Sequence, residues 1–150
     1  VGLVYVAAHA PDAGENESDL GKRMPSILAQ SGGAILRTPD ALTYLDPSRF
    51  PALFAPDLPR ERAEFAARAQ VLAAGAVFTT PLTTAAWKVK PSWGIVATSD
   101  QIINPDLERW YYARAKSYVA EIKGASHAVY ESRPEEVAAV IENAAKSLRD

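Results

Sequence analysis

The sequence contains no cysteine, only one methionine and only two histidines in 150 residues. Without cysteine, the chain cannot form a disulfide or use a thiolate as nucleophile or metal ligand. The histidines, His9 and His127, are not placed at an H-x-x-x-H or H-x-x-E spacing, so the sequence does not support a zinc site built by this chain. We therefore expect no metal site.

Clusters of basic residues and long hydrophobic runs are also absent. The 16 basic and 18 acidic residues are interspersed and give a net charge of -2, which argues against binding to nucleic acid or to a membrane surface. The apolar start of the chain is too short to span a membrane, and no basic segment of a signal peptide precedes it. We expect a cytoplasmic protein, and 48% hydrophobic residues suffice for one ordinary core.

Apolar runs and helical patterns alternate along the last third of the chain. Strands are predicted over residues 2–8, 93–98 and 117–122, and helices over 105–115 and 134–147. Asn104-Pro105 marks the start of the first helix, and a capping box, Ser132-x-x-Glu135, marks the start of the second. This alternation predicts an α/β fold with parallel strands joined by right-handed crossovers.

Residues 16–85 follow a different pattern, because prolines recur and apolar stretches are short. We expect an irregular, mostly helical insert rather than a sheet. Within it, Asp57-Leu58-Pro59 is predicted to begin a helix whose apolar spacing continues to Ala76, and residues 41–45 are a candidate short strand.

An acid and a histidine follow the last two predicted strands. Asp100 lies just after residues 93–98, and His127 lies just after 117–122. The carboxyl ends of neighbouring parallel strands meet at one edge of a sheet, so the two side chains are expected to approach to about 2.6–3.2 Å. In a hydrolytic triad, a carboxylate orients the imidazole that activates a hydroxyl nucleophile. Gly124 suits the tight turn before His127.

Other residues compete for these roles. Asp106 also follows the first strand, although its place in a first helical turn is explained by the helix dipole. His9 could line a pocket as a neighbour of the site, and Ser126 is expected to be a hydrogen-bonding residue of its loop. Trp87 and Trp93 are expected to be packing residues.

The motifs Thr98-Ser99-Asp100-Gln101 and Gly124-Ala125-Ser126-His127, with the opening Val4-Tyr5-Val6-Ala7-Ala8-His9-Ala10-Pro11-Asp12, resemble bacterial α/β-hydrolases related to plant hydroxynitrile lyases and methyl-ester esterases. The resemblance covers essentially the whole chain. It implies that Asp100 is the triad acid, that His127 is the general base, and that residues 16–85 form a cap over the pocket. It also implies three parts of one incomplete domain: core residues 1–15, the cap at 16–85, and a C-terminal core at 86–150.

The G-x-S-x-G turn that carries the serine in this family is missing from the sequence, as is the family's early oxyanion loop. Because the chain opens on Val1 directly in a predicted strand, we expect it to be the C-terminal part of a longer enzyme. Its partner is then an N-terminal segment that bears G-x-S-x-G. Alone, the 150 residues are expected to be inactive and poorly soluble, since the first strand exposes an unpaired edge.

Two classes of function remain open on the sequence. The first is a carboxylic ester hydrolase acting on a small, mostly apolar ester without a cofactor. The second is a catalytically silent fragment or binding module that has lost the nucleophile. Cleavage of a C–C bond by a lyase is less favoured, because hydroxynitrile lyases of this family carry a lysine directly after the histidine, where this chain has Ala128. His9 and Ala128 are the candidate pocket residues.

Overall fold

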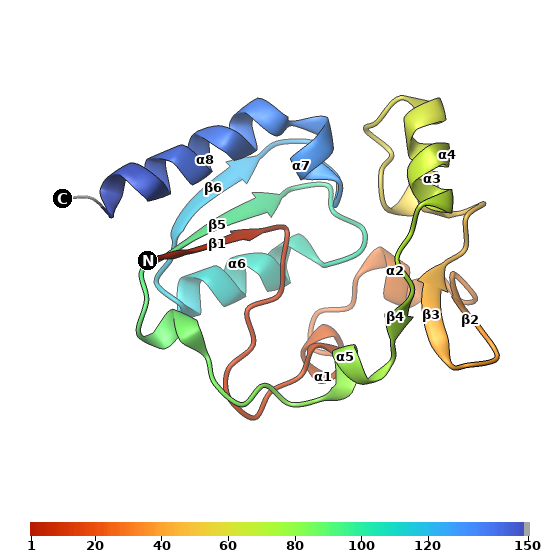
Figure 1. Ribbon diagram of the computed structural model, residues 1–150, viewed down its shortest axis with the longest axis horizontal. Helices are drawn as coiled ribbons and strands as arrows, with labels where there is room; N and C mark the ends of the chain where they lie inside the picture. Colours follow the sequence, from red (N-terminus) through yellow and green to blue (C-terminus); the bar gives the residue numbers. More distant parts are fainter. Residues whose placement is uncertain (149–150) are drawn as a thin grey trace.

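Three parallel strands form the core of the computed structural model, which describes residues 1–148 (Figure 1). They are β1 (Leu3–Val6), β5 (Ser92–Ala97) and β6 (Tyr118–Ile122), in the order β1-β5-β6. In register, Val4 lies opposite Trp93, and Trp93 lies opposite Tyr118. The predicted parallel pairing is therefore confirmed, and β5 is buried along its whole length.

Two helices cover the two faces of this sheet (Figure 1). On one face, α8 (Pro134–Ser147) covers a cluster that includes Ile95 and Ala97. On the other, α6 (Pro105–Arg114) covers a cluster that includes Val96. Alternate residues of β5 thus pack on opposite helices, as the period of two in a strand requires. The predicted α/β arrangement and both predicted helices are confirmed.

One predicted helix cap and one predicted helix end are wrong. Asn104 caps α6 as expected, since its side chain accepts a hydrogen bond from the Asp106 amide at 2.9 Å. By contrast, Ser132 ends a separate short helix, α7 (Val129–Ser132), so it cannot adopt the extended backbone of an N-cap, and α8 begins without a side-chain cap. The helix α4 (Arg60–Arg68) stops well before Ala76.

Residues 16–85 fold into short elements beside the core (Figure 1). The helices are α1 (Glu17–Gly21), α2 (Ile27–Gln30), α3 (Phe50–Leu53), α4 and α5 (Ala76–Thr79), and a 3-10 turn, η1 (Ala86–Lys88), follows. The expectation of no sheet is wrong, because β2 (Ile35–Arg37), β3 (Leu42–Leu45) and β4 (Ala73–Ala74) pair antiparallel. Gln70 stabilises this small sheet by bonding both the amide (2.9 Å) and the carbonyl (2.8 Å) of Leu45. We call residues 16–85 the cap.

A close approach between α6 and the sheet fixes the end of β1. A Cβ atom on Gly94 would lie 2.4 Å from Cδ2 of Tyr112, so only glycine fits at this point of β5. The Tyr112 hydroxyl accepts a hydrogen bond from the Ala8 amide and donates one to the Ala8 carbonyl, both at 3.0 Å. This places His9, the next residue, at the carboxyl edge of the sheet. None of the helices in residues 1–148 combines the length and apolar character that crossing a membrane requires.

Candidate active site

Two loops at the carboxyl edge of the sheet are bonded directly to each other. The Gly124 amide donates to the Thr98 hydroxyl at 2.8 Å, and the Ser99 amide donates to the Ala125 carbonyl at 2.9 Å. Gly124 has a φ of +74°, the left-handed conformation that its place in the turn predicted. The loop after β5 and the loop after β6 therefore hold a fixed relation to each other.

These loops bring Asp100 and His127 together. Nδ1 of His127 lies 2.7 Å from Oδ2 of Asp100, within the predicted range. The other carboxylate oxygen accepts hydrogen bonds from the amides of Ile102 (2.7 Å) and Ile103 (3.0 Å). The Asp100 side chain is fully buried, whereas that of His127 is 19% exposed. The Asp100 carboxylate is thus held by several hydrogen bonds, while the His127 imidazole stays accessible to a reactant.

The chemistry of this pair follows from its geometry. A carboxylate beside Nδ1 stabilises the tautomer that carries its proton there, which leaves Nε2 free to accept a proton from a nucleophile. His127 lines a cavity of about 550 Å³ whose other lining residues include Phe54 and Ile102. The His127 ring meets Phe54 edge-on, with the ring centroids 4.7 Å apart. A base therefore faces an apolar cavity.

Asp57 of the cap binds the loop after β6 that carries His127, which we call the histidine loop. Its carboxylate accepts hydrogen bonds from the Ser126 amide (3.0 Å) and from the Ser126 hydroxyl. Although burial acts to raise it, the hydrogen bonds from Ser126 hold the pKa of Asp57 below its ordinary value. The Ser126 hydroxyl also accepts from the Ala128 amide at 3.2 Å, so it serves its loop, as expected.

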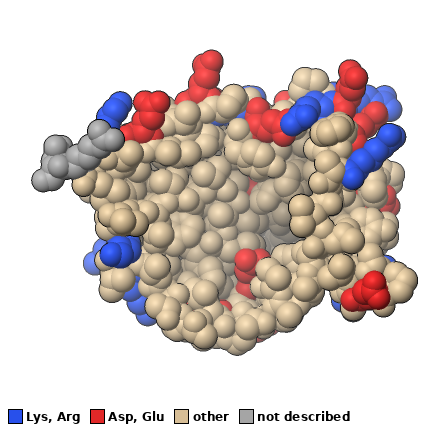
Figure 2. All heavy atoms as spheres, in the orientation of Figure 1, with Lys and Arg blue, Asp and Glu red and all other residues tan. Residues whose placement is uncertain are grey.

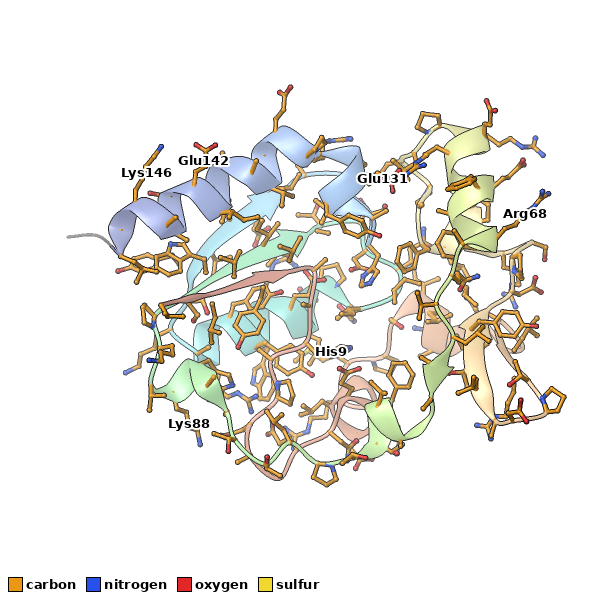
Figure 3. The ribbon with its side chains drawn as sticks, viewed as in Figure 1. His9, Arg68, Lys88, Glu131, Glu142 and Lys146 are labelled. Atoms are coloured by element: carbon orange, nitrogen blue, oxygen red, sulfur yellow. The ribbon has the colours of Figure 1, made fainter. Side chains whose placement is uncertain are left out.

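Two further contacts join the cap to this region. The Ala128 amide donates to the Phe54 carbonyl at 3.2 Å. Arg62 of α4 forms an ion pair with Glu131 of α7, which Figure 3 shows on the side of the core that faces the cap. The segment from Phe54 to Arg62 therefore sets the position of the residues on both sides of His127.

His9 lies near the site as a neutral imidazole (Figure 3). Its Nδ1 is 3.0 Å from the Tyr111 hydroxyl, and its Nε2 is 3.9 Å from a Glu17 carboxylate oxygen. Burial, together with the charge of His127, lowers the pKa of His9 to about 4. It does not line the cavity beside His127 but a second cavity of about 680 Å³. The face shown in Figure 2 is hollowed between core and cap, and most of its charged side chains lie at the outer edges.

The structure does not bring the remaining candidates to the reactive pair. Asp106 is exposed and pairs with Arg109 at 2.8 Å. Ala128 lines neither cavity, because it is 1% exposed and packs in a cluster of the cap. Trp87 donates to the Pro11 carbonyl, and Trp93 stacks on a tyrosine of β6, which are packing roles. Among residues 1–148, no three metal-binding side chains gather into a possible metal site.

Two carboxylates near the site, Asp57 and Glu108, did not follow from the sequence. Glu108 is fully buried on α6, and its Oε2 accepts a hydrogen bond from the Ala97 amide at 3.1 Å. Burial, reinforced by the charge of Asp100, raises the pKa of Glu108 to about 10. The sequence does carry a signal for Glu108, because it is an acid within the buried face of α6, next to Leu107 and one turn before Tyr111. Asp57 gave no such signal, because its partner is 69 residues away.

Comparisons with known proteins identify the family and the fold of the chain. The sequence profile of the alpha/beta hydrolase family matches residues 1–140. Among solved structures, a pyrethroid hydrolase superposes with a TM-score of 0.75 and 21% identity, covering 99% of this chain and 62% of that one. Polyneuridine aldehyde esterase superposes with a TM-score of 0.73 and 15% identity, covering 94% of this chain and 61% of that one. A methylesterase from Arabidopsis superposes with a TM-score of 0.67 and 16% identity, covering 95% of this chain and 58% of that one.

These identities are low, so the likeness to solved structures concerns the fold. The chain spans about three fifths of the length of the structures it matches. A comparison with curated proteins gives no match.

Proposed function

The chain belongs to the alpha/beta hydrolase family, and from that premise we propose that it supplies the acid and the base of a serine-type carboxylic ester hydrolase. One observation carries the proposal: the Asp100–His127 pair lies at the carboxyl ends of neighbouring parallel strands, with His127 on the wall of an apolar cavity. Open α/β sheets bind their ligands at this edge.

In the proposed reaction, Nε2 of His127 takes the proton of a serine hydroxyl as its oxygen attacks the ester carbonyl. The imidazolium is stabilised by Asp100, and it returns the proton to the departing alcohol, which leaves an acyl-enzyme. A water molecule, deprotonated by the same imidazole, then attacks the acyl carbon, and the imidazolium returns the proton to the serine oxygen as the acid leaves. The burial of Asp100 strengthens its interaction with the imidazolium, because water does not screen the carboxylate.

We assign the serine to an N-terminal segment outside these 150 residues. Support comes from the sheet, in which β1 pairs with β5 on one side and has a free edge on the other. In the family that the chain resembles, the serine strand lies beside the strand that matches β1. The share of about three fifths that this chain covers in similar structures leaves room for such a segment.

The proposed substrate is a small, mostly apolar ester. The cavity beside His127, of about 550 Å³, is lined by apolar residues such as Leu28, Phe54 and Ile102 and by few charged groups, which supports a substrate of this kind. The methylesterase among the similar structures acts on the same bond class by its name. The residue after the histidine, Ala128, supplies no cation for a cyanide leaving group, which favours hydrolysis over lyase chemistry.

The test uses the full-length protein. A fluorophosphonate probe should label one serine upstream of residue 1 of this chain, and a short-chain aryl ester should be hydrolysed at a rate that the probe abolishes. Peptide mass spectrometry locates the label. Hydrolysis without labelling would contradict the serine mechanism, and neither hydrolysis nor labelling would favour a silent member of the fold. A mandelonitrile assay tests the lyase alternative directly.

A further inference from the structure

A second carboxyl group lies behind the Asp100–His127 pair. Glu108 is fully buried on α6, and one of its oxygens is bonded to the Ala97 amide at the end of β5. Its other oxygen, Oε1, is buried and has no hydrogen-bond donor in residues 1–148. A buried ionised carboxylate with an unpaired oxygen is costly, so the group needs either a cation or a proton.

No cation in the described part of the chain is available to Glu108. Arg109 is the cation whose charge favours an ionised Glu108, but its guanidinium is bonded to Glu121 (2.7 and 2.8 Å) and to Asp106 (2.8 Å). The charge of Asp100 acts against ionisation of Glu108, and the hydroxyl of Tyr112 already donates its proton to the Ala8 carbonyl. The proton is therefore the remaining solution, and it must point to an acceptor.

Glu108 and Asp100 meet at the same turn, because Glu108 Oε2 accepts from the Ala97 amide at 3.1 Å and the Asp100 amide donates to the Ala97 carbonyl at 3.0 Å, so we assign Asp100 as that acceptor. Interaction with the Asp100 side chain, through charge and through a hydrogen bond, is among the causes that raise the pKa of Glu108. Two carboxylates cannot share a hydrogen bond, whereas a carboxylic acid and a carboxylate form a strong one. A protonated Glu108 would therefore be a further donor to Asp100, in addition to His127 and the two loop amides.

We propose that Glu108 is a positioning residue for the triad acid: its protonated carboxyl donates a hydrogen bond to Asp100 and holds that carboxylate against His127. This inference rests on the proposed function in so far as it concerns catalysis. The hydrogen bond itself does not depend on it. In this role, Glu108 acts as a glutamine amide would, with one acceptor for the Ala97 amide and one donor for Asp100.

The experiment compares three variants of the full-length protein. Glu108→Gln keeps the donor and the acceptor, Glu108→Leu removes both, and Asp106→Asn is the matched control for an exposed acid on the same helix. Infrared spectroscopy at neutral pH should show the carbonyl stretch of a buried carboxylic acid in the wild type and in Asp106→Asn, and it should be lost in Glu108→Gln. That readout requires no catalysis.

Kinetics give the second readout. Glu108→Gln should keep the wild-type kcat, whereas Glu108→Leu should lower kcat about 10- to 100-fold with KM little changed, because Asp100 loses its fixed orientation. Should Glu108→Leu fail to fold, the infrared band and Glu108→Gln still decide the matter. A wild type without the acid band, or a Glu108→Gln variant with a strongly reduced kcat, overturns the proposal. If no form hydrolyses esters, the proposed function fails, and the band still tests the hydrogen bond.

Discussion

His127 and Asp100 are joined by a 2.7 Å contact between Nδ1 and Oδ2, although 27 residues separate them in the sequence. Neither loop alone creates the pair. The contact depends on the parallel register of β5 and β6, in which Ala97 lies opposite Ile122 and both loops begin at the same level of the sheet. Two adjacent strands thus bring an acid and a base together, and the amides of Ile102 and Ile103 and the contact of Ser126 with Asp57 then hold the pair in place.

The first prediction concerns this pair. In the full-length protein, His127→Ala and Asp100→Asn should each lower the rate of ester hydrolysis about 10³-fold or more, because the serine loses its base or the base loses its orienting carboxylate. The His127 side chain is partly exposed, so His127→Ala should leave the urea unfolding midpoint nearly unchanged. Asp106→Asn is the control. Near-normal turnover in His127→Ala would remove this residue as the general base.

The second prediction concerns the hydrogen bonds between Asp57 of the cap and the histidine loop. Asp57→Ala leaves the Ser126 amide and hydroxyl without their acceptor, which should destabilise the protein by about 1–3 kcal/mol and lower kcat. Asp40→Ala, an exposed change elsewhere in the cap, is the control. Urea denaturation and initial rates measure both effects.

This loss should depend on pH. The pKa of Asp57 is lowered in the folded protein, so its stabilising effect is present above the ordinary value and is lost as the pH falls through the folded value. Wild type and Asp57→Ala should therefore converge in stability in acid. A difference that stays constant down to about pH 2 would contradict the assigned hydrogen bonds.

The third prediction concerns the contact of α6 with the sheet. Gly94→Ala places a Cβ atom 2.4 Å from Tyr112, which cannot shift without breaking its two bonds to Ala8. We expect a loss of about 1–3 kcal/mol in the free energy of unfolding. Gly21→Ala, where no atom lies within 4 Å of the added methyl group, is the matched control and should be neutral. Equal effects of the two changes would argue against the close packing described here.

The sequence predicted the core well because its signals there are local. The apolar runs, the Asn104 cap and Gly124 each reflect a requirement of a single element, and the strand ends then place Asp100 and His127. The cap was predicted less well because its structure depends on distant contacts. Its small sheet joins Ala73 to Thr43, and the Gln70 side chain bonds the backbone of a strand 25 residues away.

The capping box failed for a related reason. Ser132 and Glu135 have the right spacing, but the turn of helix that begins at Val129 already includes Ser132. Likewise, whether Glu108 is a charged or a buried, protonated side chain depends on the residues that pack against it. On a solvent-facing helix the same residue would be an ordinary charge, and only the packing of α6 beneath Asp100 makes it a buried acid.

The fourth prediction uses the pH dependence of stability. The pKa of Glu108 rises from 4.5 to about 10 on folding, so the folded protein keeps a proton that the unfolded chain releases above about pH 4.5. The contribution of Glu108 to the free energy of unfolding is fully present below that pH and declines as the pH rises toward 10. Relative to Glu108→Gln, whose side chain does not titrate, the wild type should lose stability as the pH rises above 4.5. Parallel stability curves would contradict a protonated Glu108.

The last prediction concerns the free edge of β1. Leu3 to Val6 pair with β5 along one side, and the unpaired backbone groups on the other side belong to a strongly apolar strand. Such an edge associates with other strands, so residues 1–150 expressed alone should aggregate and should not hydrolyse esters. Expression together with the upstream segment should give a soluble, active protein, as measured by size-exclusion chromatography and aryl ester turnover. As a control on the edge itself, Val4→Pro should weaken pairing of the segment with β1 and reduce recovery of activity, because the amides of Leu3 and Ala7 point to β5, that of Val4 points to the free side, and proline has no amide proton to donate. A monomeric 150-residue chain that hydrolyses esters unaided would show that the nucleophile lies within these residues and that the two-segment proposal is mistaken.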